Sequence, residues 1–213
     1  MVTPDFRKDL PAENQWDLLA EYGQGLENAF HALWVEGDDP EEVAVLFGVD
    51  SESRAECGLD TLGTSVYRGG PEVGIWIGPH APGWTHIFAF NLYLHPLGLP
   101  NLGKRRVFEI DYTGEVGPGL SPLHLHYDGE MLGDVTPPQE PGELVDLPEY
   151  QPLTEGLELG GHDTYDEDLH SYFCLMGRIT GRFTDREWWT ATRAFYRIPA
   201  KVKSYDDPFS SGP

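Results

Sequence analysis

The sequence predicts an α+β domain with a central antiparallel β-sheet of about five or six strands, packed by helices from both ends of the chain. Three observations indicate this class. Aromatic and β-branched residues concentrate in the middle of the chain, amphipathic patterns lie near both ends, and an Asp-Gly pair separates two extended segments. Among the 213 residues 39% are apolar and 12% aromatic, enough to fill a hydrophobic core.

Two helices are predicted near the N-terminus. Residues 15–34 carry apolar side chains at spacings of three and four, which is typical of an amphipathic helix. Asp39 then offers an N-cap acceptor, Pro40 suits the first helical position, and Gly48 suits a left-handed stop. The second helix is therefore expected over about 40–47.

The middle of the chain is predicted to form strands. The candidates are 62–68, 73–78, 84–92, 105–112 and 121–127. The Asp128-Gly129 pair that follows is typical of a two-residue hairpin turn, so a return strand is expected over 130–135. This order favours an antiparallel meander.

A long connection and two helices complete the predicted fold. Residues 136–163 are rich in Pro, Gly and acids, which favours a connection over the surface. A helix is expected over about 165–178, and a capping box from Thr184 to Glu187 begins another over about 185–196. We expect one domain over residues 15–198, between a flexible N-terminus (1–14) and a flexible tail (199–213).

The strong negative charge excludes several functions. The chain has 36 Asp and Glu against 14 Lys and Arg, a formal charge of -22. Such a surface repels phosphate backbones and anionic lipids, so neither nucleic acid nor a membrane surface is expected as a partner. The chain has no apolar run of 18 residues, its first 14 residues lack the apolar core of a secretory signal, and Cys57 and Cys174 form no disulfide framework. We therefore expect a cytoplasmic protein.

The acids are clustered in two runs. Nine lie between Glu36 and Asp60, and ten lie between Pro137 and His170, where there is no Lys or Arg. Three interpretations of these runs remain open: a solvated, self-repelling surface, a docking face for a basic protein, or a surface that mimics DNA. The high overall acidity also occurs in salt-adapted proteins, so it can reflect a salt-rich habitat.

Four segments resemble a known family. They are GDDPEEVAVLFGVD, GWTHIFAFN, YDGEMLGDV and LMGRITGRFTDREW. In this order they resemble a large actinobacterial family of uncharacterised acidic proteins, over about residues 15–197. The family often has Glu in the Trp-led strand where this chain has Asn91. The resemblance implies a single α+β domain and no activity. By looser analogy it suggests a role like that of immunity or phage-conflict proteins.

Two groups of residues are candidates for chemistry. His124 and His126 would share one face of a strand, where His162 and Asp163 could complete a metal site; exposed histidines are the alternative. Asp166, His170 and Cys174 fall four residues apart on one helix face, like an acid–base–thiol triad. Because a thiol in mid-helix lacks an oxyanion hole, a helix flank with a semi-buried cysteine is the favoured interpretation.

The tryptophans are expected mostly in the core. Because Trp188 and Trp189 are adjacent in a helix, they cannot face the same side, so one of them is expected at a surface or groove. An exposed Trp beside acidic segments would suit a protein-binding face.

The sequence therefore predicts a non-catalytic protein, without a cofactor, that docks to or neutralises a more basic protein partner. The residues predicted to contact that partner are Trp188, Trp189, Asp163, Asp166, Glu167 and Asp168. The alternative is a metal-dependent enzyme or metal-binding protein that uses His124 and His126.

Overall fold

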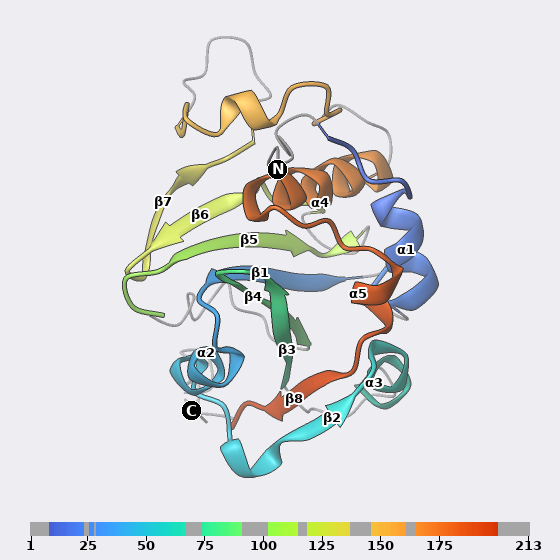
Figure 1. Cartoon of the computed structure of the whole chain (residues 1–213), viewed down its shortest axis with the longest axis vertical. Helices are drawn as coiled ribbons and strands as arrows, with labels where there is room; N and C mark the ends of the chain where they lie inside the picture. Colours follow the sequence, from blue (N-terminus) through green and yellow to red (C-terminus); the bar gives the residue numbers. More distant parts are fainter. Residues whose placement is uncertain are drawn as a thin grey trace, which may run out of the picture.

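The computed structural model describes residues 9–23, 26–27, 29–66, 74–90, 102–114, 119–136, 146–160 and 165–199. Within these residues it contains one antiparallel sheet of eight strands and five α-helices (Figure 1). The strands are β1 (Phe30–Glu36), β2 (Ala55–Cys57), β3 (Gly74–Ala81), β4 (Trp84–Phe90), β5 (Arg106–Tyr112), β6 (His124–Tyr127), β7 (Glu130–Asp134) and β8 (Arg193–Arg197). The helices are α1 (Gln15–Tyr22), α2 (Pro40–Phe47), α3 (Leu59–Val66), α4 (Asp166–Thr180) and α5 (Arg186–Thr190). The α+β class is confirmed, and five or six strands was an underestimate.

The strand order is β2-β8-β3-β4-β1-β5-β6-β7. The predicted meander is confirmed for β5, β6 and β7, which pair in chain order. It is also confirmed for β3 and β4, which pair with each other. It is wrong between β4 and β5, because β1 lies between them, and β8 lies between β2 and β3.

Local signals placed α2 correctly. The Asp39 carboxylate accepts hydrogen bonds from the backbone N–H groups of Glu41 (3.0 Å) and Glu42 (3.3 Å), and Gly48 ends the helix with a φ of 83°. A left-handed backbone suits glycine because it has no Cβ.

Three sequence-based predictions of secondary structure are wrong. The predicted helix over 15–34 ends at Tyr22, and Phe30–Glu36 forms the central strand β1. The predicted helix over 185–196 ends at Thr190, and Arg193–Arg197 forms β8. The predicted strand over 62–68 overlaps helix α3. In β1 and β8, residues on both faces are buried, and the backbone pairs with neighbouring strands. Because this burial depends on distant strands, the periodicity of the local sequence does not report it.

The two faces of the sheet carry separate cores. Trp34, Trp76 and Phe88 point to the face covered by α1, α4 and α5, here called the α4 face. Leu33 and Ile87 point to the opposite face, here called the α2 face, where α2 packs. Figure 1 shows α4 above strand β1 and α2 below it. Alternate residues of each strand therefore enter different environments.

The β6–β7 hairpin forms one end of the sheet. Its turn residues Asp128 and Gly129 have φ values of 54° and 83°, the left-handed pattern of a tight type I′ turn. His126 pairs with Met131 and Leu125 with Gly133, which leaves Leu132 as an extra residue in a β-bulge. The predicted Asp-Gly hairpin is confirmed.

None of the described helices is both long enough and apolar enough to cross a membrane.

Candidate functional site

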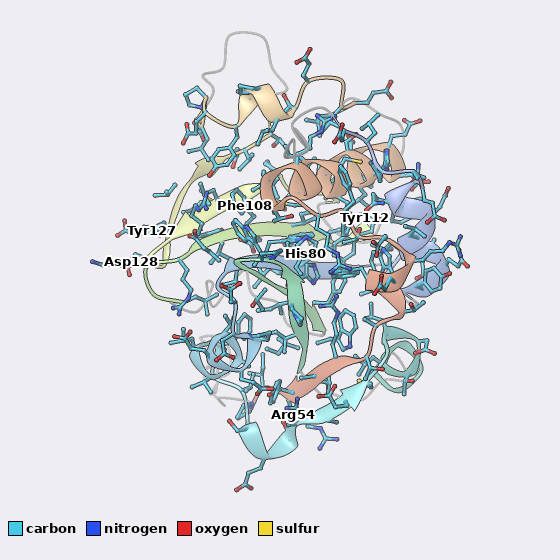
Figure 2. All side chains as sticks on the ribbon, in the orientation of Figure 1. Arg54, His80, Phe108, Tyr112, Tyr127 and Asp128 are labelled. Atoms are coloured by element: carbon cyan, nitrogen blue, oxygen red, sulfur yellow. The ribbon has the colours of Figure 1, made fainter. Side chains whose placement is uncertain are left out.

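Three large apolar side chains are exposed at the outer end of the β6–β7 hairpin. The exposed fraction is 59% for Met131, 51% for Leu132 and 39% for Tyr127. Together with the exposed Glu130 they are here called the hairpin patch. Figure 2 shows Tyr127 and Asp128 at the outer end of this hairpin. Tyr127 pairs with Glu130 and His126 with Met131, so Tyr127 and Met131 lie on opposite faces of the hairpin. Exposed large apolar side chains at a sheet edge are typical of interaction sites.

The sequence around the hairpin patch is acidic. The described segments 119–136 and 146–160 contain no Lys or Arg. Their acids are Asp128, Glu130, Asp134, Asp146, Glu149, Glu155 and Glu158. The nearest basic run is Lys104 to Arg106 at the start of β5. Two of its three cations are already paired, Arg105 with Glu42 (2.7 Å) and Arg106 with Glu36 (2.9 Å).

The acids of α2 are in a different situation. Glu41 accepts a hydrogen bond from Arg54 at 3.0 Å, and Glu42 is paired with Arg105. Glu130, by contrast, makes no ion pair within the described part of the chain. Local cations therefore offset part of the charge on α2 but not the charge of Glu130.

The edge strand β7 is covered at its C-terminal end. The Asp146 carboxylate accepts a hydrogen bond from the Asp134 backbone N–H (3.2 Å), and the Gln151 side chain donates to the Val135 carbonyl (3.2 Å). A bulge at Leu132 further disturbs the edge. Such features hinder pairing with an added strand, so a partner would meet side chains here rather than an open backbone edge.

A histidine–carboxylate network lies behind the hairpin on the α2 face. Glu109 of β5 bridges two imidazoles: its carboxylate oxygens lie 2.6 Å from His31 Nε2 and 2.6 Å from His126 Nε2. Asp111 lies 3.6 Å from His31 Nδ1. The network connects β1, β5 and β6 through side chains on one face of the sheet.

The electrostatics of this network favour its charged form. Burial lowers the pKa of His31, but the hydrogen-bonding carboxylates of Asp111 and Glu109 outweigh burial and raise this pKa to about 9. Burial raises the pKa of the Glu109 carboxyl, but His126 and His31 bind it and bring this pKa well below its ordinary value. At neutral pH the network is therefore a buried ion pair with a bridging carboxylate.

The two histidines predicted to bind metal do share a strand face. The ring centroids of His124 and His126 are 6.3 Å apart. Each ring is bound to its own carboxylate, His124 to Asp134 (2.7 Å) and His126 to Glu109. Among the described residues, no group of three or more His, Cys, Asp or Glu side chains could hold a metal ion. His162 lies outside the described residues, and the metal site stays a prediction.

The expected exposure of one tryptophan of α5 is wrong. Trp188 and Trp189 are 0% and 1% exposed. The two indoles contact each other at 4.9 Å between centroids; Trp188 also packs on Trp76, and Trp189 stacks on Phe88. Arg186, Glu187 and Thr190 of the five-residue helix α5 are exposed, and both indoles are buried because each contacts the core of the α4 face.

The acidic residues predicted to contact a partner differ in how far they are exposed to solvent. Asp166 and Glu167 are exposed in the first turn of α4. Asp168 is buried, and its carboxylate accepts a hydrogen bond from the Gly160 backbone N–H. It therefore does not fit the predicted contact surface, because it points into the fold. Asp163 lies outside the described residues.

The Asp166–His170–Cys174 spacing places the buried Cys174 sulfur 3.6 Å from His170 Nε2. Burial raises the pKa of the Cys174 thiol to about 12, so it stays protonated at neutral pH. His170 Nδ1 accepts a hydrogen bond from the Gln15 backbone N–H (3.0 Å) and so anchors the start of α1. These contacts support the interpretation of a helix flank with a buried cysteine.

Sequence reasoning missed the hairpin patch, although Met131 and Leu132 within an acidic hairpin were a readable signal. It also missed His31 and Glu109, because their contact depends on strand pairing.

No protein-family model, curated protein or solved structure matches this chain. The resemblance to an actinobacterial family stays a prediction.

Proposed function

We propose that this protein binds a basic protein partner through the hairpin patch. The observation that supports the proposal is that three exposed apolar side chains and Glu130 lie at the end of one hairpin, in segments that have acids and no Lys or Arg. This proposal keeps the partner class inferred from the charge and moves the contact from Trp188 to the hairpin.

The patch combines two features of protein interfaces. Tyr and Met are enriched at interface centres, where they fill pockets of the partner. Surrounding acids would attract a basic protein over a distance and speed association at low salt. The formal charge of -22 extends that attraction to the whole molecule. Neutralisation of a toxic basic protein, as immunity proteins do, is one form of this role.

Affinity capture with full-length protein tests the proposal. The wild-type chain is immobilised and exposed to a lysate of the native host at low salt and at about 0.5 M salt, where screening shortens charge interactions to a few ångström. We expect one basic protein to be retained at low salt and released at high salt, as identified by mass spectrometry.

Matched variants locate the contact. Glu130→Lys and Met131→Ser change the hairpin patch, whereas Glu52→Lys makes the same charge change on the 3-10 helix η1 (Ser51–Ser53). We expect Glu52→Lys to retain the partner and both hairpin variants to lose it. Equal retention by all variants would contradict the hairpin site, and an empty bait at both salts would contradict the function itself.

A further inference from the structure

The end of the β6–β7 hairpin is exposed on both of its faces. Residues 127–132 are all exposed, whereas Leu125 and Gly133 on the same two strands are buried. This run is here called the hairpin tip, and Figure 2 shows two of its residues, Tyr127 and Asp128, at the margin of the molecule. A strand covered on one face exposes only every second residue. The continuous exposed run therefore shows that neither layer of helices covers the tip.

The two faces of the hairpin tip each carry a large side chain that is typical of interfaces. Tyr127 pairs with Arg106 and lies on the α4 face, whereas Met131 pairs with His126 and lies on the α2 face. Tyr and Met are both enriched where proteins contact one another. A flat partner surface could bury one of these side chains but not both, because the hairpin backbone stands between them.

Positive groups behind the tip are already bound to carboxylates on both faces. On the α4 face, Arg106 donates to the Glu36 carboxylate from Nη2 (2.9 Å) and from Nε (3.2 Å). On the α2 face, the Glu109 carboxylate lies 2.6 Å from His126 Nε2. The tip itself contains two acids and no Lys or Arg. Its charge is therefore negative and complementary to a basic surface.

We propose that the hairpin tip enters a cleft of its partner, with Tyr127 against one wall and Met131 against the other. This inference rests on the proposed function and specifies the partner: a protein whose cleft has apolar walls and Lys or Arg at its base. Aromatic side chains contribute most to binding in desolvated pockets, and a cleft surrounds the tip from both sides. Addition of the partner as a further strand is disfavoured, because a bulge at Leu132 and the hydrogen bond from Asp134 to Asp146 disturb the edge of β7.

Variants that change one face at a time test this inference. Full-length Tyr127→Ser and Met131→Ser are used as baits in the low-salt lysate capture, and the partner retained by wild type is titrated against each. Binding in a cleft predicts that each variant lowers the affinity at least about tenfold, because each face loses a central contact. Val45→Ser is the matched control: Val45 is 65% exposed on α2 and should not contribute. Thermal unfolding of each variant checks that the fold is kept.

Hydroxyl-radical labelling of the wild-type protein gives a test that needs no variant. The free protein and the captured complex are labelled and analysed by mass spectrometry. We expect the complex to protect both Tyr127 and Met131, whereas Tyr165, which is 36% exposed on the far side of the fold's α4 layer, should stay labelled.

The outcomes separate the cleft from the proposed function. Loss of affinity in both variants, with protection of both side chains, supports the cleft. Loss or protection on one face only would overturn the cleft and leave a partner that binds one side of the hairpin. A wild-type bait that retains no basic protein would overturn the proposed function and the cleft with it.

Discussion

Two groups of histidines lie on opposite faces of the same sheet and take opposite charge states. On the α2 face, His31 contacts Glu109 and Asp111, and its pKa rises to about 9. On the α4 face, His80 and His86 are surrounded by indoles and arginines. Burial, assisted by Arg182 and Arg193, lowers the pKa of His80 to about 3. The type of residue and the degree of burial are similar, so the neighbours decide the charge.

The neighbours differ because strand residues alternate between the two faces. On β5, Glu109 and Asp111 point to the α2 face, whereas Phe108 and Ile110 point to the α4 face. A carboxylate network thus forms beside the hairpin, while an aromatic core forms one layer away. The following experiments test this contrast, starting from the largest expected effect.

Truncation of Trp188 should have the largest effect on stability. We expect Trp188→Ala to lower the free energy of unfolding by about 3–5 kcal/mol, because it leaves a large cavity and removes a cation–π contact with Arg193. Urea unfolding at pH 7 measures this loss. Met131→Ala, an exposed truncation, should stay within about 0.5 kcal/mol. A loss below about 1 kcal/mol in Trp188→Ala would mean that this side chain is not buried.

Removal of the bridging charge should break the α2-face network. We expect Glu109→Gln to lower the free energy of unfolding by about 3 kcal/mol, because it leaves a charged His31 buried without its closest partner. The same substitution should bring the pKa of His31 down, as measured by NMR titration. Glu130→Gln is the exposed control and should change neither quantity; an unchanged His31 pKa in Glu109→Gln would show that Glu109 is not its main partner.

The α2-face network should make the protein less stable at alkaline pH. The pKa of His31 is higher in the folded state (about 9) than in the unfolded state (about 6.5), so its stabilisation is complete below pH 6.5 and is lost as the pH rises toward 9. We expect a loss of about 2–3 kcal/mol over this range. Urea unfolding across the range should show a clearly smaller slope in His31→Gln, and an equal slope in both proteins would contradict the assignment.

The α4-face histidines should act in the opposite direction, at acidic pH. Their pKa values are lower in the folded state, so only the unfolded state takes up protons as the pH falls below about 6.5, and stability falls. Each histidine should lower the free energy of unfolding by about 1 kcal/mol for each pH unit below this value. Because carboxylates also titrate in this range, the measurement is the difference in slope between wild type and His86→Phe from pH 6.5 to 5. The variant should lose less stability; a slope as steep as that of wild type would place His86 in contact with solvent.

The smallest expected effect concerns the hydrogen bond of His80. Thr180→Val keeps the side-chain shape but removes the hydroxyl that donates to the Met176 carbonyl and lies 3.0 Å from His80 Nε2. We expect a loss of about 1 kcal/mol in urea unfolding at pH 7. No loss would indicate that His80 Nε2 has another partner, such as buried water.

The candidate site was only partly predictable from sequence. His124 and His126 were correctly placed on one strand face because the period of a strand is a local property. Glu109, the carboxylate partner of His126, could not be identified, because the register of β5 against β6 is set by strand pairing and not by the local sequence. Trp188 and Trp189 were misjudged because the prediction assumed that adjacent residues of a helix cannot both be buried, whereas both indoles of the short helix α5 enter the core.

The sequence by itself determined the features whose causes lie within a few residues: the cap and stop of α2, the Asp-Gly turn of the β6–β7 hairpin, the strand periodicity of β3 to β6, and the strong negative charge. Only the tertiary structure decided that Phe30–Glu36 is the central strand, that both tryptophans of α5 are buried, and which histidines meet carboxylates. The reason is physical: a cap or a turn satisfies its own hydrogen bonds locally, whereas burial and charge depend on which distant strands pair and which face each residue enters.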